Sequence, residues 1–259
     1  MKIGCCTNIK DLGLAKEAGF DYAELAGRSI MALDDTAFSQ LLQDKSECGL
    51  PCPALNAYCP PEIVIAGPGF SAENTRNYAG KCAERAGQLG VLTVGIGSPF
   101  SRILPEDYPK DLAIKQISEF LTITADEFSR HGITVCIESL GECYCNFINS
   151  VDESLMLVEK LKLPNLKIVI DFYQMEHSRE DTIDIAPFIN CVAHAHTSDD
   201  DGSPQLRSFL HEDRRSIHEE RIRRLAVAGY NGRISLETDV PFDMEKAVHS
   251  LSMLREAID

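Results

Sequence analysis

Short apolar runs alternate with longer amphipathic stretches along the whole of this 259-residue chain. Some runs, such as Ile168-Val169-Ile170, are apolar at consecutive positions. This pattern is typical of a strand that is covered on both faces, as in a parallel sheet. Eight runs have this character, and we expect strands at residues 2–6, 21–25, 52–56, 91–97, 133–139, 166–171, 191–196 and 233–237.

Helical stretches lie between these runs. Residues 71–89 begin with Ser71 as a candidate N-cap and end before Gly90. At Gly19 and Gly229, as at Gly90, a glycine at an apparent helix end is followed directly by a strand. Further helices are expected at 110–131, 152–161, 216–228 and 243–257.

Strands that alternate with helices predict an α/β fold with a parallel sheet. The length is typical of one (β/α)8 TIM barrel, and 44% hydrophobic residues suffice for a large core. We therefore expect a single (β/α)8 barrel domain over residues 1–259. An open, doubly wound sheet is the alternative. It would normally have a glycine-rich phosphate turn after its first strand, which CCTNIKDLG (5–13) is not.

The formal net charge of −15 bears on the partners. Such a surface repels phosphate backbones and anionic membranes, so we expect no nucleic acid and no membrane partner. No basic leader precedes an apolar run at the N-terminus. Ten cysteines without an export signal, and without paired CxxC knuckles, indicate free thiols in a cytoplasmic protein.

Candidate site residues follow from the ends of the strands, where the active site of a barrel lies. The fifth to eighth predicted strands end in Glu138, Asp171, His196 and Glu237. One carboxylate after a strand is often only a helix cap. Four such groups converging without a cation would be costly, so we expect them to bind one divalent metal. This donor set favours Mn²⁺ and allows Mg²⁺, Co²⁺ or Zn²⁺.

The chain resembles a known family, the xylose-isomerase-like barrels of sugar and sugar-phosphate isomerases and epimerases, which is related to endonuclease IV. The resemblance covers nearly the whole chain and implies the same four metal ligands. It rests on GFDYAEL (19–25), NYAGKCAERAGQLGVLTVGIGSP (77–99), VCIESLG (135–141), VIDFYQM (169–175), HAHTSDDDG (194–202) and AGYNGRISLET (228–238).

The resemblance also implies a mechanism on a carbohydrate substrate. The metal would hold a carbonyl oxygen and a neighbouring hydroxyl, and would stabilise the enediolate formed when a C–H proton leaves. Glu138 and Glu237 would be the catalytic residues, on opposite sides of the carbon skeleton. Proton transfer on two faces gives epimerisation, whereas transfer between adjacent carbons by one carboxylate gives aldose–ketose isomerisation. The residues leave this choice open.

Substrate contacts are expected from five further residues. Asn56 and Ser98 lie at or just after the ends of the third and fourth strands. Gln174 stands where epimerases of the family usually carry a substrate-binding histidine, and His177 lies close enough to replace it. Arg207 is the candidate for an arginine that the family often carries after the histidine strand, although the accompanying Pro-Gly turn is missing here.

Three other functions remain as alternatives. A lyase or dehydratase, including an enzyme that cleaves a carbon-linked glycoside, would use the same metal site. A non-catalytic sugar-binding subunit is the second alternative. An endonuclease on abasic DNA is disfavoured by the negative charge and by the few histidines at strand ends.

Four smaller features complete the predictions. The stretch Asp199–Gly202 is expected to be a solvated loop, and the arginines between 214 and 224 a solvated helix face, with a phosphate grip as the alternative. His194 is expected to form hydrogen bonds rather than bind metal. Loop 58–70 is expected to be a lid or a subunit contact, which leaves a homo-oligomer open.

Overall fold

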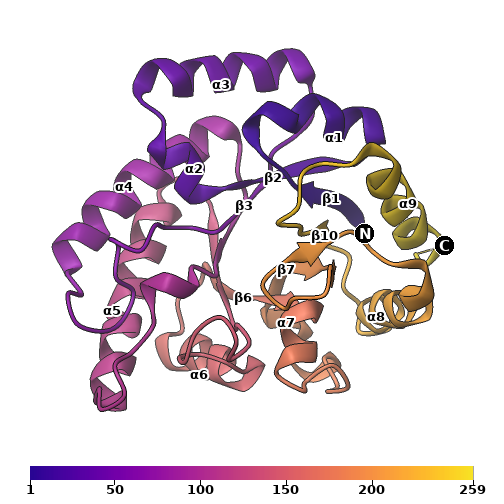
Figure 1. The fold of residues 1–259 in the computed structure, drawn as a ribbon. Coiled ribbons are helices and arrows are strands. Elements are labelled where there is room, and N and C mark those ends of the chain that lie inside the picture. Colours follow the sequence, from indigo (N-terminus) through magenta and orange to yellow (C-terminus); the bar gives the residue numbers. More distant parts are fainter. Residues whose placement is uncertain (259) are drawn as a thin grey trace.

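The computed structural model describes residues 1–258 and contains a closed barrel of parallel strands surrounded by helices (Figure 1). Around the barrel the strands follow the order β1-β10-β7-β6-β5-β4-β3-β2. The predicted (β/α)8 TIM barrel is therefore confirmed. The barrel strands are β1 (Lys2–Cys6), β2 (Tyr22–Ala26), β3 (Ala54–Asn56), β4 (Thr93–Ile96), β5 (Thr134–Glu138), β6 (Leu166–Asp171), β7 (Val192–Thr197) and β10 (Arg233–Leu236).

The helices cover the outside of the barrel. Ser71 caps α4 as predicted, since its Oγ accepts a hydrogen bond from Asn74 N at 3.2 Å. Gly90 ends the same helix with a φ of 75°, a left-handed conformation that favours glycine. The α-helices are α1 (Leu12–Ala18), α2 (Gly27–Ala32), α3 (Asp35–Cys48), α4 (Ala72–Leu89), α5 (Lys110–Ser129), α6 (Val151–Leu161), α7 (Phe172–His177), α8 (Arg215–Val227) and α9 (Met244–Glu256).

Apolar side chains fill the space between the strands and the helices. Ile117, Phe120 and Phe128 on α5 are fully buried, as are Val135 and Ile137 on β5. Burial of this apolar surface is the main force that holds each helix on the barrel. Within residues 1–258 all ten cysteines are free, and no helix there has the length and apolar character to span a membrane.

The stretch after β7 differs from the expected solvated loop. β8 (Asp199–Asp200) pairs antiparallel with β9 (Arg207–Ser208) over the rim of the barrel. Asp199 is buried. Its carboxylate accepts hydrogen bonds from His218 Nε2 at 2.9 Å and His211 N at 2.8 Å and forms an ion pair with Arg214, and these partners make the burial of its charge possible. The prediction of a solvated loop is thus wrong for Asp199, whose partners His211, Arg214 and His218 follow it by 12 to 19 residues.

The arginines of α8 also depart in part from a solvated helix face. Arg223 is exposed and pairs with Glu220, as expected. Arg221 is buried, and its Nη2 lies 2.5 Å from Glu176 Oε2, which Arg214 also contacts. These arginines attach α8 to α7, so this part of the prediction is wrong.

Candidate metal centre and adjoining cavity

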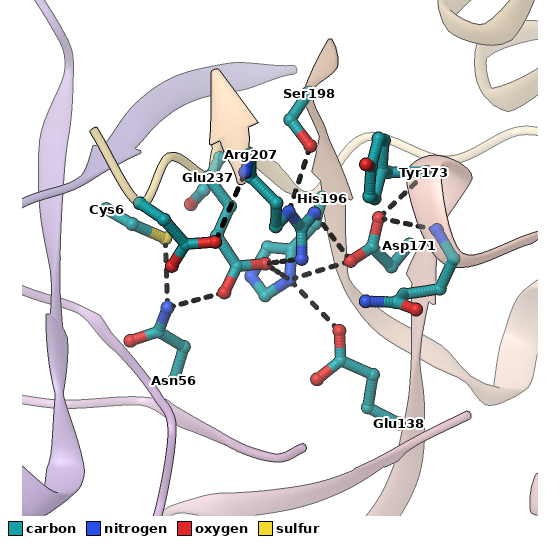
Figure 2. Close-up of polar contacts among 12 residues, drawn as sticks. Cys6, Asn56, Glu138, Asp171, Tyr173, His196, Ser198, Arg207 and Glu237 are labelled. Carbon is teal, nitrogen blue, oxygen red and sulfur yellow. Dashed lines mark hydrogen bonds and ion pairs between the residues drawn. The ribbon is translucent and has the colours of Figure 1, made fainter. Parts of the chain in front are cut away.

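Four neighbouring strands bring the predicted ligands to one rim of the barrel (Figure 2). Glu138 and Asp171 are the last residues of β5 and β6, His196 lies near the end of β7, and Glu237 directly follows β10. Since parallel strands in contact end at the same rim, their terminal side chains converge. The register places Asp171 opposite His196.

The four side chains can present one donor atom each within 4.8 Å of one another. His196 Nδ1 lies 3.0 Å from Glu237 Oε2, 3.4 Å from Glu138 Oε1 and 3.9 Å from Asp171 Oδ2. Glu138, Asp171 and His196 are buried, and Glu237 is partly buried. The structure thus brings together all four predicted ligands, which we call the donor cluster.

The donor cluster has the composition that a hard or borderline divalent cation requires. Three carboxylates and one imidazole meet the preferences of Mn²⁺ and Mg²⁺, and an imidazole also suits Zn²⁺. Glu237 Oε2 is buried without a hydrogen-bond partner among the described residues, although two cationic side chains lie close to it. A carboxylate oxygen that is held by ion pairs alone keeps a lone pair with which it can also bind a cation. The residues present therefore fit a divalent metal.

Arg207 on β9 neutralises part of this negative charge. Its guanidinium is buried, with Nη1 2.6 Å from Glu237 Oε2 and Nη2 2.7 Å from Asp171 Oδ2. Nε donates to Ser198 Oγ at 3.0 Å, and the group packs over the Tyr173 ring at 5.0 Å. Arg207 therefore lies directly against the donor cluster (Figure 2).

The two glutamates of the donor cluster have different proton affinities. Burial raises the pKa of Glu138 to about 7. Burial acts in the same direction on Glu237, but the charges of Arg207 and His196 outweigh it and lower the pKa of Glu237 to about 2. Burial lowers the pKa of His196. The negative carboxylates of Glu237 and Glu24 outweigh this effect and raise the pKa of His196 well above its usual value.

A cavity of about 250 Å³ adjoins the donor cluster on the side of β1, β2 and β3. Asn56 lies at its boundary, where its Nδ2 donates to Glu237 Oε1 at 2.8 Å and to Cys6 Sγ at 3.3 Å. The lining is mostly polar and includes Cys6, Thr7, Asn8, Arg28, Asn56, Glu237 and Asp239. A small polar molecule placed here would reach Glu237 directly.

The side chains of the other predicted substrate contacts have partners outside the donor cluster. Gln174 is buried, and its Oε1 accepts from Gly141 N at 2.8 Å. Ser98 accepts from Cys59 N at 3.0 Å through its Oγ. His177 lines a separate cavity with Lys110 and Glu142. Of the five predicted contacts, only Asn56 and Arg207 place their side chains against the donor cluster, whereas Gln174 reaches Asp171 Oδ1 through its backbone N–H at 3.4 Å. The roles of all five remain predictions.

The sequence assigned no role to Glu24, which lies within the second expected strand, residues 21–25. The residue is fully buried, and its carboxylate contacts His194, His196 and Ser235. Cys6, Glu24 and His196 can also place one donor atom each within 4.8 Å of one another. The signal that the sequence offered for a role of Glu24 was an acidic residue within an otherwise apolar strand. Its partners could not be predicted, because they come from strands across the barrel.

Comparisons with known proteins agree with this architecture. A family model described as xylose isomerase-like TIM barrel matches residues 12–257. A sequence comparison with curated proteins gives no significant match. A structure of D-psicose 3-epimerase from Clostridium cellulolyticum H10 superposes with a TM-score of 0.81 at 17% identity and covers 100% of both chains.

Two further structures are similar. The 3-keto-D-glucoside 4-epimerase of E. coli has a TM-score of 0.78 at 18% identity, with 99% of each chain covered. An AP endonuclease of family 2 from Brucella melitensis has a TM-score of 0.71 at 17% identity, with 97% of this chain and 98% of that chain covered. At such identities the likeness establishes the fold alone.

Proposed function

Because the chain belongs to the xylose isomerase-like TIM barrel family, we propose that it is a divalent-metal-dependent epimerase or isomerase acting on a sugar or a related hydroxy-ketone. The observation that carries the proposal is the convergence of Glu138, Asp171, His196 and Glu237 beside a polar cavity. The size of that cavity supports a small substrate, because the pockets that bind drug-sized ligands have volumes of about 300–1,000 Å³.

The proposed metal ligands are the four residues of the donor cluster, and Mn²⁺ is the preferred ion. When bound, a divalent cation supplies Lewis acidity that draws electron density from a substrate carbonyl, worth several kcal/mol. Arg207 then orients a substrate oxygen and keeps Asp171 and Glu237 from repelling each other.

Glu237 and Glu138 are proposed to move the proton. One carboxylate takes a proton from the carbon next to the carbonyl, and the electron pair of the broken C–H bond passes into an enediolate. The other carboxylate returns a proton to the opposite face, which inverts that carbon. Asn56 holds Oε1 of Glu237 and so fixes the direction in which this carboxylate faces the cavity.

The proposal is tested by a screen of ketoses with the Mn²⁺-loaded protein in deuterated water. We expect a substrate that takes up deuterium at the reacting carbon and yields an epimer or isomer of the same carbon skeleton. Glu138→Gln and Glu237→Gln should each lower turnover by about 10²–10⁴-fold, the range for loss of a general acid or base. Glu142→Gln is the matched control, since Glu142 is an exposed acid four residues after Glu138.

The same screen separates the alternatives. Products of lower mass would indicate a lyase or dehydratase on the same site. Sugar binding without deuterium uptake would indicate a binding subunit. Unchanged turnover in both glutamine variants would refute the proposed roles of these glutamates.

A further inference from the structure

A second polar group is buried inside the barrel, in contact with the donor cluster. Glu24 on β2 is its centre, and Tyr22, His194 and Ser235 complete what we call the interior cluster. His194 and Ser235 lie on the neighbouring strands β7 and β10, neither of which is next to β2. Glu24 therefore reaches across the barrel. None of the proposed chemical steps uses this carboxylate.

The hydrogen bonds of the interior cluster permit one consistent assignment of donors. Ser235 Oγ donates to Glu24 Oε2 at 2.5 Å, and the Tyr22 hydroxyl lies 2.9 Å from the same Oγ. His194 Nε2 lies 2.7 Å from Glu24 Oε2. A carboxylate that receives several donors is held in its ionised form, which only accepts hydrogen bonds.

His194 fits this assignment as a donor through Nε2. Its Nδ1 is buried without a hydrogen-bond partner among the described residues. A proton on Nδ1 would create a buried, unpaired N–H group, which is costly. The proton of His194 is therefore on Nε2, and Glu24 is its acceptor.

The same assignment of hydrogen-bond donors and acceptors applies to His196, one of the proposed metal ligands. His196 Nε2 lies 3.1 Å from Glu24 Oε1, so this nitrogen must carry a proton and donate it. We propose that Glu24 is a positioning residue that holds His196 as the Nε2–H tautomer and so directs Nδ1 to the metal. The inference rests on the proposed function, because it assigns the orientation of a ligand in that site.

This assignment also decides between one and two cation sites. Cys6 and Glu24 could form a second site only if His196 Nε2 offered a lone pair to it. Glu24 already accepts the Nε2 proton, and Cys6 Sγ accepts from Asn56. We therefore expect one cation per chain.

The test compares Mn²⁺ binding by calorimetry in the wild-type protein and in Glu24→Gln. The amide retains the size of the side chain but can donate as well as accept, so it no longer selects one tautomer of His196. We expect the Mn²⁺ affinity to fall about 10–100-fold, as when a partner of a ligating histidine is lost. Asp199→Asn is the matched control, since Asp199 is also a buried carboxylate that contacts a histidine, His218, but both residues lie outside the donor cluster. The Mn²⁺ affinity of this variant should equal that of the wild type.

A second measurement needs no variant and therefore stands even if Glu24→Gln fails to fold. Nitrogen-15 NMR of the Zn²⁺-loaded wild-type protein should show His196 with a proton on Nε2 and the metal on Nδ1. A proton on Nδ1, two cations per chain, or an unchanged Mn²⁺ affinity in folded Glu24→Gln would overturn the inference about Glu24 while leaving the proposed function in place. A wild-type protein that binds neither ion would overturn both.

Discussion

The two halves of the barrel mouth are built in opposite ways. On β5, β6, β7 and β10 the strand ends carry charged donors that are buried and joined by ion pairs. On β1, β2 and β3 the strand ends carry Cys6, Ala26 and Asn56, which are small or neutral and line the cavity. The charged half is arranged to hold a cation, whereas the neutral half leaves room for a substrate.

The difference has an electrostatic origin. Buried carboxylates are stable only with cations beside them, so the charged half needs Arg207 together with either a protonated His196 or the proposed metal. The strand ends of the neutral half carry no buried carboxylate, so their side chains can change in shape without leaving a charge unpaired. Substitutions on the two sides should therefore separate metal binding from substrate binding.

The largest effect is expected from Arg207→Met. This change leaves Asp171 and Glu237 without their guanidinium partner, and breaking a buried pair in this way costs about 3–5 kcal/mol. Since the proposed metal neutralises the same two carboxylates, saturating Mn²⁺ should recover part of the lost stability. Urea unfolding with and without Mn²⁺ measures both quantities.

Arg214→Met provides the comparison outside the mouth. Arg214 pairs with Asp199 and Glu176, neither of which belongs to the donor cluster. Its loss of stability should be no smaller in the presence of Mn²⁺ than in its absence. An Arg207→Met deficit that Mn²⁺ does not reduce would show that the guanidinium and the cation serve different carboxylates.

Substitutions of Asp171 can separate metal binding from stability, because its two carboxylate oxygens have different partners. Oδ1 caps α7 by accepting from Tyr173 N at 2.9 Å, and Oδ2 faces Arg207 and the donor cluster. Asp171→Asn keeps a good helix cap but loses a charged ligand, so Mn²⁺ affinity should fall by more than about 100-fold with little loss of stability. Asp171→Ala should lose a similar affinity and about 1 kcal/mol more of stability.

Calorimetry and thermal unfolding of these two Asp171 variants give the affinity and the stability separately. Equal stability of the two variants would mean that the cap contributes nothing. An Asp171→Asn protein with wild-type affinity would remove Asp171 from the proposed ligand set.

The same contrast explains what could be predicted from the sequence. The barrel and its charged half were predictable because consecutive apolar positions identify buried parallel strands, and strand ends in a barrel share one rim. Glu138, Asp171, His196 and Glu237 could thus be grouped without knowing any distance. The contacts of Arg207 on β9 could not be predicted, since they depend on how a hairpin folds back over the rim.

Contacts across the barrel were equally hidden. Glu24 bonds to His194 at a separation of 170 residues along the chain, and no local pattern encodes that pairing. The buried position of Asp199 depends on His218 and Arg214, which are only 19 and 15 residues away but belong to the segment that follows β9. His177 follows Gln174 closely in the sequence, but it lines a separate cavity and not the one beside Glu237.

On the neutral half, Thr7→Trp should block the substrate without disturbing the metal. Thr7 is partly buried and lines the cavity, so an indole there would occupy the space beside Glu237. We expect kcat/KM to fall on the order of 100-fold, as when a substrate is displaced from its reacting geometry. Mn²⁺ affinity should stay at the wild-type value, and Thr7→Ser should be fully active. Full activity of Thr7→Trp would move substrate binding away from this cavity.

The smallest effect is expected where the two halves meet, at Asn56. Its amide donates to Glu237 Oε1, whereas Oε2 of the same carboxylate faces His196 and Arg207. Asn56→Ala removes one hydrogen bond to a charged group, so kcat should fall about 10-fold while Mn²⁺ affinity changes little. Steady-state kinetics paired with calorimetry tests this, and Asn56→Gln tests whether a longer amide can restore the bond. If Asn56→Ala instead weakens Mn²⁺ binding as strongly as Asp171→Asn, the neutral half also supports the metal, and the division between the two halves fails at this residue.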